Sequence, residues 1–309
     1  MLSYPSLLPW GWAGPHIAYR MNCFPRFLLC LFGLTCSAGW AQVDVRLETA
    51  KTAYLQFSPI PFTVRLKNQG ATELRLTETK GQPWLEMIVQ SRDGMLIPPE
   101  KPMSPPDKVL KSGESTAISV DLAPYYLVRD TGGYRVRASV HLPSGEKLLT
   151  ESLDFLIGKG EVIWSVPRGD GKERRIYSLL KFYEDPNVGL YLKVEVPEKN
   201  LVYPVRRLGP YLPLGKPKAE FDSDNHLHLL YATAAGVYRI TVVNADGNLL
   251  REESRQQGVD TPDLKKNEAG EVHIQGGTVM LPSSLRERLS TLQSRIGAKA
   301  LPNAESATP

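Results

Sequence analysis

Short segments in which apolar and polar residues alternate fill the chain from about residue 43 onward. Clear examples are Phe62–Lys67, Ile118–Leu122 and Tyr134–His141. A period of two gives each segment one apolar and one polar face, which is typical of strands in an antiparallel sheet. Turn residues such as Asp93-Gly94 and Ser112-Gly113 separate the segments. The pattern therefore predicts an all-β protein.

One motif in this region is more specific than the strand pattern. Asp130–Tyr134 has the form D-x-G-x-Y, and Val136 follows two residues after the tyrosine. The motif resembles the corner before the F strand of immunoglobulin-like domains, where the tyrosine hydroxyl bonds back to the chain and the residue two positions on enters the core. Val136 stands where an antibody-type domain carries Cys, so the resemblance is to a disulfide-free bacterial type. It implies an Ig-like antiparallel sandwich over residues 42–160, a fold that by itself specifies no chemistry.

Three segments beyond residue 160 resemble copies of one unit, a polar turn followed by an alternating strand. They are Asp185–Val194, Asp222–Tyr231 and Asn267–Gly276. Their spacing of roughly 40 residues is close to the period of a β-propeller blade. A closed propeller has typically about 4–8 blades, so three copies favour a β-meander of blade-like hairpins over residues 161–280. Chance similarity between hairpins is the alternative.

The segment Met21–Gln42 has the organisation of a secretory signal peptide. Arg26 precedes the apolar run Phe27–Cys36, and small residues lie just before Gln42. We predict translation from Met21, cleavage before Gln42, and a start-site extension plus signal peptide in residues 1–41. The apolar run is shorter than the roughly 20 residues that span a bilayer, so no stable membrane span is expected after cleavage.

All three cysteines, Cys23, Cys30 and Cys36, lie within this leader. The predicted mature chain therefore has no disulfide, no thiolate nucleophile and no cysteine-ligated metal. The sequence also has no Asn-x-Ser/Thr sequon. Together these features predict an extracytoplasmic bacterial protein, either periplasmic or secreted.

Composition excludes several classes of protein. The chain has 37 Lys and Arg against 33 Asp and Glu, a net charge of +4, and the two signs are interspersed. This distribution lacks the basic patch expected of a nucleic-acid binder. The apolar content of 42% is that of a globular protein and argues against a disordered chain.

The best candidate for a metal site is Asp222-x-Asp224-x-His226-x-His228. Alternate residues of a strand share one face, and two imidazoles with carboxylates are competent metal ligands. The competing interpretation is structural, because Asp222, Asp224 and the adjacent Asn225 are also the residues that a tight turn before a strand requires.

The sequence lacks the common catalytic motifs, including a nucleophile elbow, H-E-x-x-H, a P-loop and G-x-G-x-x-G. Acids such as Glu184 and Glu220 occur, but no pattern pairs two of them across a cleft. We therefore expect no cofactor and a non-catalytic binding or scaffolding protein, with a protein or glycan partner in the envelope or extracellular space. The alternative is a metal-assisted or carbohydrate-directed hydrolase. Six aromatic residues are candidates for contacts with sugars: Trp84, Tyr125, Tyr126, Trp164, Tyr191 and Tyr238.

The carboxyl end changes character. Ser284–Glu287 has the form of a helix capping box, and the apolar residues up to Ile296 recur at helical spacing. Residues 281–309 are therefore predicted to form one amphipathic helix followed by a loose tail.

Overall fold

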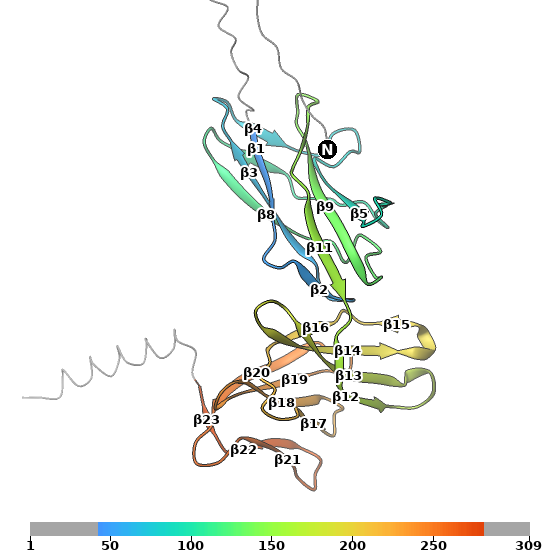
Figure 1. Ribbon diagram of the computed structural model, residues 1–309, viewed down its shortest axis with the longest axis vertical. Helices are drawn as coiled ribbons and strands as arrows, with labels where there is room; N and C mark the ends of the chain where they lie inside the picture. Colours follow the sequence, from blue (N-terminus) through green and yellow to red (C-terminus); the bar gives the residue numbers. More distant parts are fainter. Residues whose placement is uncertain (1–42, 281–309) are drawn as a thin grey trace, which may run out of the picture. The chain divides into compact units, whose positions relative to one another are not determined.

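The computed structural model describes residues 43–280, which are almost entirely strands and turns (Figure 1). Within this range the helical segments are the 3-10 turns η1 (Gly171–Glu173) and η2 (Pro197–Lys199). The all-β prediction is confirmed. The predicted signal peptide and carboxyl-terminal helix lie outside the described residues. No helix between residues 43 and 280 has the length and apolar character that crossing a membrane requires.

Strands follow one another along the whole described chain. Those of residues 43–158 are β1 Val43–Glu48, β2 Ala53–Leu55, β3 Pro61–Asn68, β4 Leu74–Leu76, β5 Leu85–Ser91, β6 Leu96–Ile97, β7 Lys108–Leu110, β8 Ser115–Asp121, β9 Gly132–His141, β10 Lys147–Leu149 and β11 Leu153–Gly158. Those of residues 161–279 are β12 Glu161–Arg168, β13 Arg175–Tyr183, β14 Val188–Val196, β15 Leu201–Val202, β16 Arg206–Pro210, β17 Lys218–Phe221, β18 Leu227–Ala234, β19 Val237–Val243, β20 Leu249–Gln256, β21 Asp263–Lys266, β22 Val272–Gln275 and β23 Thr278–Val279.

Two sheets of residues 43–158 share one core. A three-stranded sheet has the order β1-β3-β8, and a six-stranded sheet has the order β2-β11-β9-β5-β6 with β10 beside β9. Buried residues of both sheets form a single hydrophobic cluster, in which Phe155 of β11 lies 5.4 Å from the ring of Phe62 and 5.5 Å from that of Tyr134. The strands predicted from alternation correspond to β3, β8 and β9, and their apolar faces are the buried ones.

Residues 161–279 form small, blade-like antiparallel sheets. Two five-stranded sheets have the orders β12-β13-β14-β15, with β16 also on β14, and β17-β18-β19-β20-β23, and β21 pairs with β22 in a separate two-stranded sheet. Side chains from both sheets, among them Tyr177, Leu192 and Leu229, make one buried cluster, so the sheets pack face to face as neighbouring propeller blades do.

The three similar segments found in the sequence occupy equivalent places in hairpins. Each begins at the turn of an antiparallel hairpin and continues into its second strand, which is β14, β18 or β22. No strand of residues 43–158 pairs with a strand of residues 161–279. The division into two domains near residue 160 stays a prediction.

Candidate functional site

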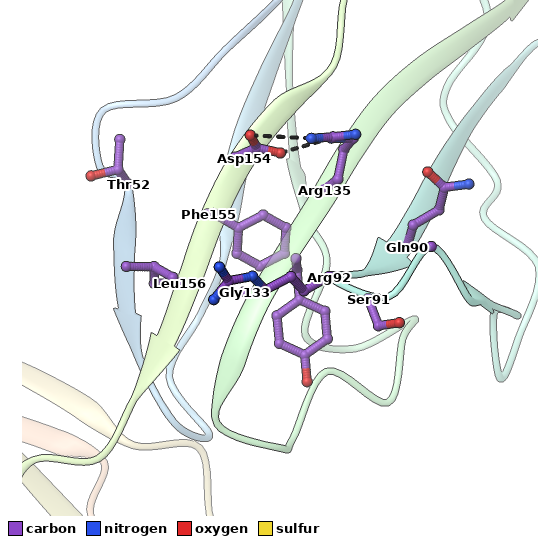
Figure 2. Close-up of a pocket in the computed structure, with 11 residues that line it drawn as sticks. Thr52, Gln90, Ser91, Arg92, Gly133, Arg135, Asp154, Phe155 and Leu156 are labelled. Carbon is purple, nitrogen blue, oxygen red and sulfur yellow. Dashed lines mark hydrogen bonds and ion pairs between the residues drawn. The ribbon is translucent and has the colours of Figure 1, made fainter.

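A hollow opens on the face of the six-stranded sheet that points away from its core (Figure 2). Leu156 of β11 pairs with Gly133 of β9, and Arg92, which follows β5, donates its backbone N–H to the Gly133 carbonyl at 2.9 Å. Figure 2 shows these three residues in a row across neighbouring strands. Because Gly133 has no side chain, the Arg92 side chain extends over it toward Leu156, and these residues line a cavity of about 450 Å³.

The backbone conformation of Gly133 does not require glycine. Its neighbour Gly132 has a φ of 153°, within the range that favours glycine, whereas Gly133 is not among the residues with positive φ. A glycine inside a strand lowers the stability of the folded protein by roughly 0.5–1 kcal/mol relative to alanine. Such glycines often mark a place where a ligand or another chain approaches the backbone closely. Glycine at position 133 therefore indicates a place where a ligand or another chain approaches the strand.

The adjacent row of the sheet contributes polar groups to the hollow. Arg135 of β9 pairs with Asp154 of β11 on one side and with Gln90 of β5 on the other. The Arg135 guanidinium donates to both Asp154 carboxylate oxygens, at 2.8 and 3.4 Å. This hydrogen bond lowers the pKa of Asp154 and raises that of Arg135. The charge of Arg135 is thus already neutralised within the site.

Arg92 and Leu156 provide the groups that are free to contact a ligand. The Arg92 side chain is exposed, and within residues 43–280 it makes no ion pair and no side-chain hydrogen bond. Leu156 is 56% exposed although it is large and apolar. A cavity with an apolar wall and one uncompensated cation is suited to holding a ligand that has both an apolar and an anionic part.

Sequence reasoning did not find this hollow. The only local signal was the second glycine of Asp130–Tyr134, at a position where the D-x-G-x-Y motif accepts any residue. Arg92 and Leu156 are distant from it in the sequence, and only the pairing of β5, β9 and β11 brings them together.

The candidate metal residues lie at the hairpin between β17 and β18. Asn225 has a φ of 61°, and the Asp222 N–H donates to the His226 carbonyl at 3.1 Å, which closes a tight loop. Asp222 Oδ1 accepts the backbone N–H groups of Asp224 and His226 at 3.0 and 2.8 Å. Asp222 therefore stabilises the turn, as the structural interpretation of the motif requires.

The same aspartate also contacts both imidazoles. Asp222 Oδ2 lies 3.1 Å from His226 Nδ1 and 2.9 Å from His228 Nε2. Burial opposes the charged form of Asp222, but hydrogen bonds from His228 and His226 outweigh it and lower the pKa of the carboxyl. Three of the four predicted residues are thus together, while the Asp224 side chain is exposed and joins the cluster only through its backbone.

Within residues 43–280, no group of three or more His, Cys, Asp or Glu side chains is arranged to hold a metal ion. Both histidines direct one ring nitrogen at the same carboxylate oxygen rather than at a shared empty position. The metal assignment of Asp222, Asp224, His226 and His228 stays a prediction.

Most of the other candidate residues are buried or already bound to neighbouring side chains. Glu184 is only 3% exposed and binds the Arg207 guanidinium at 2.6 Å and the Lys51 ammonium at 2.5 Å, and it also accepts the Tyr191 hydroxyl. Although burial opposes ionisation, these donors lower the pKa of Glu184 to about 2. Glu184 is therefore ionised at neutral pH, as the anion of an ion cluster. Of the six aromatic residues considered for sugar contacts, Trp84, Tyr126 and Tyr191 are buried and the others half-buried.

No protein-family model matches this chain, and no curated protein does. Among solved structures, the β-glucosidase from Listeria innocua in complex with isofagomine has 11% identity over 38% of this chain and 16% of its own, with a TM-score of 0.26. The sporulation control protein Spo0M from Bacillus subtilis has 10% identity over 52% and 81%, with a TM-score of 0.28. The E. coli chaperone DraB has 11% identity over 68% and 96%, with a TM-score of 0.24. The chain thus spans about a sixth of the β-glucosidase chain, and similarities at these TM-scores carry no conclusion about fold or function.

Proposed function

We propose that this protein is a non-catalytic binding module that acts outside the bacterial cytoplasm, and that residues 42–160 are an Ig-like sandwich which presents the hollow. The Tyr134 hydroxyl donates to the Asp130 carbonyl at 2.8 Å, and Val136 is fully buried. Both features agree with the corner of Ig-like domains. Two sheets that enclose one core also agree with a sandwich.

The observation that carries the binding function is the hollow at Gly133. It combines an unstrained strand glycine, an exposed Leu156 and an uncompensated Arg92. Its volume of about 450 Å³ lies within the ~300–1,000 Å³ range of ligand pockets. Taken singly, each of these features is unfavourable or neutral for the stability of the fold. Together they form a surface suited to binding a ligand.

Site-specific photo-crosslinking tests this function. A photo-reactive amino acid is placed at Ser91, which lines the hollow, and separately at Ser119, an exposed position on β8 of the other sheet. In cells that make the protein, we expect a discrete crosslinked partner from position 91 and none from position 119. Equal crosslinking from both positions, or none from position 91, would contradict a binding role for the hollow.

A further inference from the structure

We propose that the hollow recognises a protein segment in which an acidic side chain stands beside an apolar one. The acidic group pairs with Arg92, and the apolar side chain packs at Gly133 against Leu156 and the hydrocarbon stem of Arg92. This inference rests on the proposed binding function and specifies the chemistry of its partner.

The charged residues that line the hollow favour binding of an anionic group. Arg92, Arg135 and Asp154 are the charged residues that line the hollow. Arg135 and Asp154 neutralise each other through two hydrogen bonds, as the dashed lines in Figure 2 show. Arg92 remains as a cation without a partner among residues 43–280. A guanidinium presents paired N–H donors that match a carboxylate in geometry as well as charge, so an Asp or Glu side chain is the expected counterpart.

The shape of the hollow selects an apolar neighbour for that acid. A Cβ atom built on Gly133 would lie 3.6 Å from Arg92 Cδ and 3.7 Å from Leu156 Cδ2, so the stem of the arginine and the leucine flank the gap at contact distance. Both flanks are hydrocarbon, because an arginine stem is apolar up to its guanidinium. A side chain that packs at Gly133 therefore contacts apolar atoms of Arg92 and Leu156.

The apolar surface continues beside the hollow on the hairpin of β5 and β6. Met95 is 71% exposed and Leu96 is 61% exposed. Met95 accepts the backbone N–H of Ser91, a lining residue, and Leu96 pairs with Gln90, another lining residue. Exposed apolar side chains grouped around a cavity mark interaction surfaces, and Met adapts readily to a partner's shape. The surface thus extends over more than one side chain of a bound segment.

A protein segment fits this surface better than a glycan. Sugar rings are held against exposed aromatic faces. The aromatic residues at the hollow are Tyr134 and Phe155, which are only 8% and 1% exposed because both pack into the core. The exposed groups are instead aliphatic side chains, a methionine and a guanidinium, which pair with the side chains of another protein.

Selection from a random peptide library displayed on phage tests the inference. The purified exported chain is the target, and the Arg92→Glu variant serves for counter-selection. We expect the enriched peptides to carry Asp or Glu next to an apolar residue. Fluorescence anisotropy with one labelled enriched peptide should then show at least tenfold weaker binding to the Arg92→Glu and Gly133→Val variants.

Matched variants separate the hollow from general effects of charge and bulk. Lys147→Glu makes the same charge change on β10 of the same sheet, and Ala117→Val adds bulk at an exposed position of β8. Both should bind the peptide as the unmodified chain does. All variants should keep the unmodified melting temperature within a few degrees, because position 133 has ordinary backbone geometry. A peptide in which Lys replaces the acid should bind Arg92→Glu better than the unmodified chain.

Three results would overturn the inference: no enriched peptide, enriched peptides without acids, or equal binding to Arg92→Glu. None of them removes the proposed binding function, which depends on crosslinking from position 91. A crosslinked glycan, or a crosslinked protein whose contact segment has no acidic residue, would leave the binding function standing while the acidic partner is rejected.

Discussion

Glu184 keeps a negative charge where only 3% of its side chain reaches solvent. An isolated carboxylate in such a place would take up a proton, because burial favours the neutral form. Arg207, Lys51 and the Tyr191 hydroxyl reverse that preference and lower the pKa of Glu184 to about 2. The cluster is therefore a structural element whose contribution to stability depends on pH.

Replacing Glu184 with Gln should lower the free energy of unfolding by about 3 kcal/mol at pH 7, because Arg207 and Lys51 lose their counter-charge. The pKa of this carboxyl is depressed in the folded protein, so its contribution is complete above the ordinary value of 4.5 and is lost as the pH falls toward about 2. Urea unfolding at several pH values should show the difference between the two proteins shrinking over this window.

Glu161→Gln is the matched control for this measurement. Glu161 binds Lys181 at 2.9 Å but is 65% exposed, so its loss should lower the unfolding free energy by less than about 1 kcal/mol. A difference between the unmodified chain and Glu184→Gln that stays constant from pH 5 to 2 would show that the carboxylate is not the stabilising group.

Asp222, Asp224, His226 and His228 give the metal hypothesis its test. An ion at this place would have to displace the hydrogen bonds from His226 and His228 to Asp222. The hypothesis predicts a stoichiometric metal ion in the purified protein and its loss from the doubly substituted His226→Ala, His228→Ala variant. Elemental analysis by mass spectrometry measures both. A chain that purifies without an ion and gains none on addition of zinc would leave these residues with the structural role alone.

At the level of elements, strand β9 contributes side chains both to the hydrophobic core and to the hollow. Its inward positions Tyr134 and Val136 enter the core, while Gly133, which precedes Tyr134, and Arg135, which lies between the two, face outward into the site. Alternation along one strand thus places Tyr134 and Val136 on the core side of the sheet and the hollow on the other side. The Tyr134 hydroxyl bond holds the start of β9, where Gly133 lies.

Replacing Tyr134 with Phe should lower the free energy of unfolding by about 1 kcal/mol, the usual net value of one intramolecular hydrogen bond. The aromatic ring and its stacking against Phe155 at 5.5 Å remain, so the variant isolates the bond to Asp130. Chemical denaturation measures the change. Tyr183→Phe is the control, because the Tyr183 hydroxyl contacts Asp185 at a 60% exposed side chain. Equal effects of the two substitutions would deny the corner a special role.

The strands themselves could be predicted because their signal is local. Tyr134–His141 alternates strictly in the sequence, and β9 includes all of it with its apolar side buried. The register between strands has no comparable local signal. Nothing in the sequence near Gly133 specifies that Arg92 lies on one side of it and Leu156 on the other.

For the whole molecule, the untested expectation is export. If the leader is removed before Gln42, mass spectrometry of the protein recovered from outside the cytoplasm should find Gln42 as its first residue. The exported chain would then contain no cysteine, and its melting temperature should be the same with and without a reducing agent. An amino terminus upstream of Cys36 would contradict both the cleavage site and the absence of cysteine from the exported chain. A Cys36→Ser variant is the control for lipidation, and its export should be unchanged.

The amino-acid sequence by itself determined the all-β class, the positions of its clearest strands, the bond from the Tyr134 hydroxyl back to the chain at Asp130, and the turn at Asp222. Each depends on residues only a few positions apart, so their alternation or turn chemistry can be recognised directly in the sequence. Only the tertiary structure decided that Leu156, Gly133 and Arg92 form one row, and that Glu184 meets Arg207 and Lys51. These groupings depend on strand order and register, which arise from packing two faces around a common core and from contacts between residues far apart in the chain.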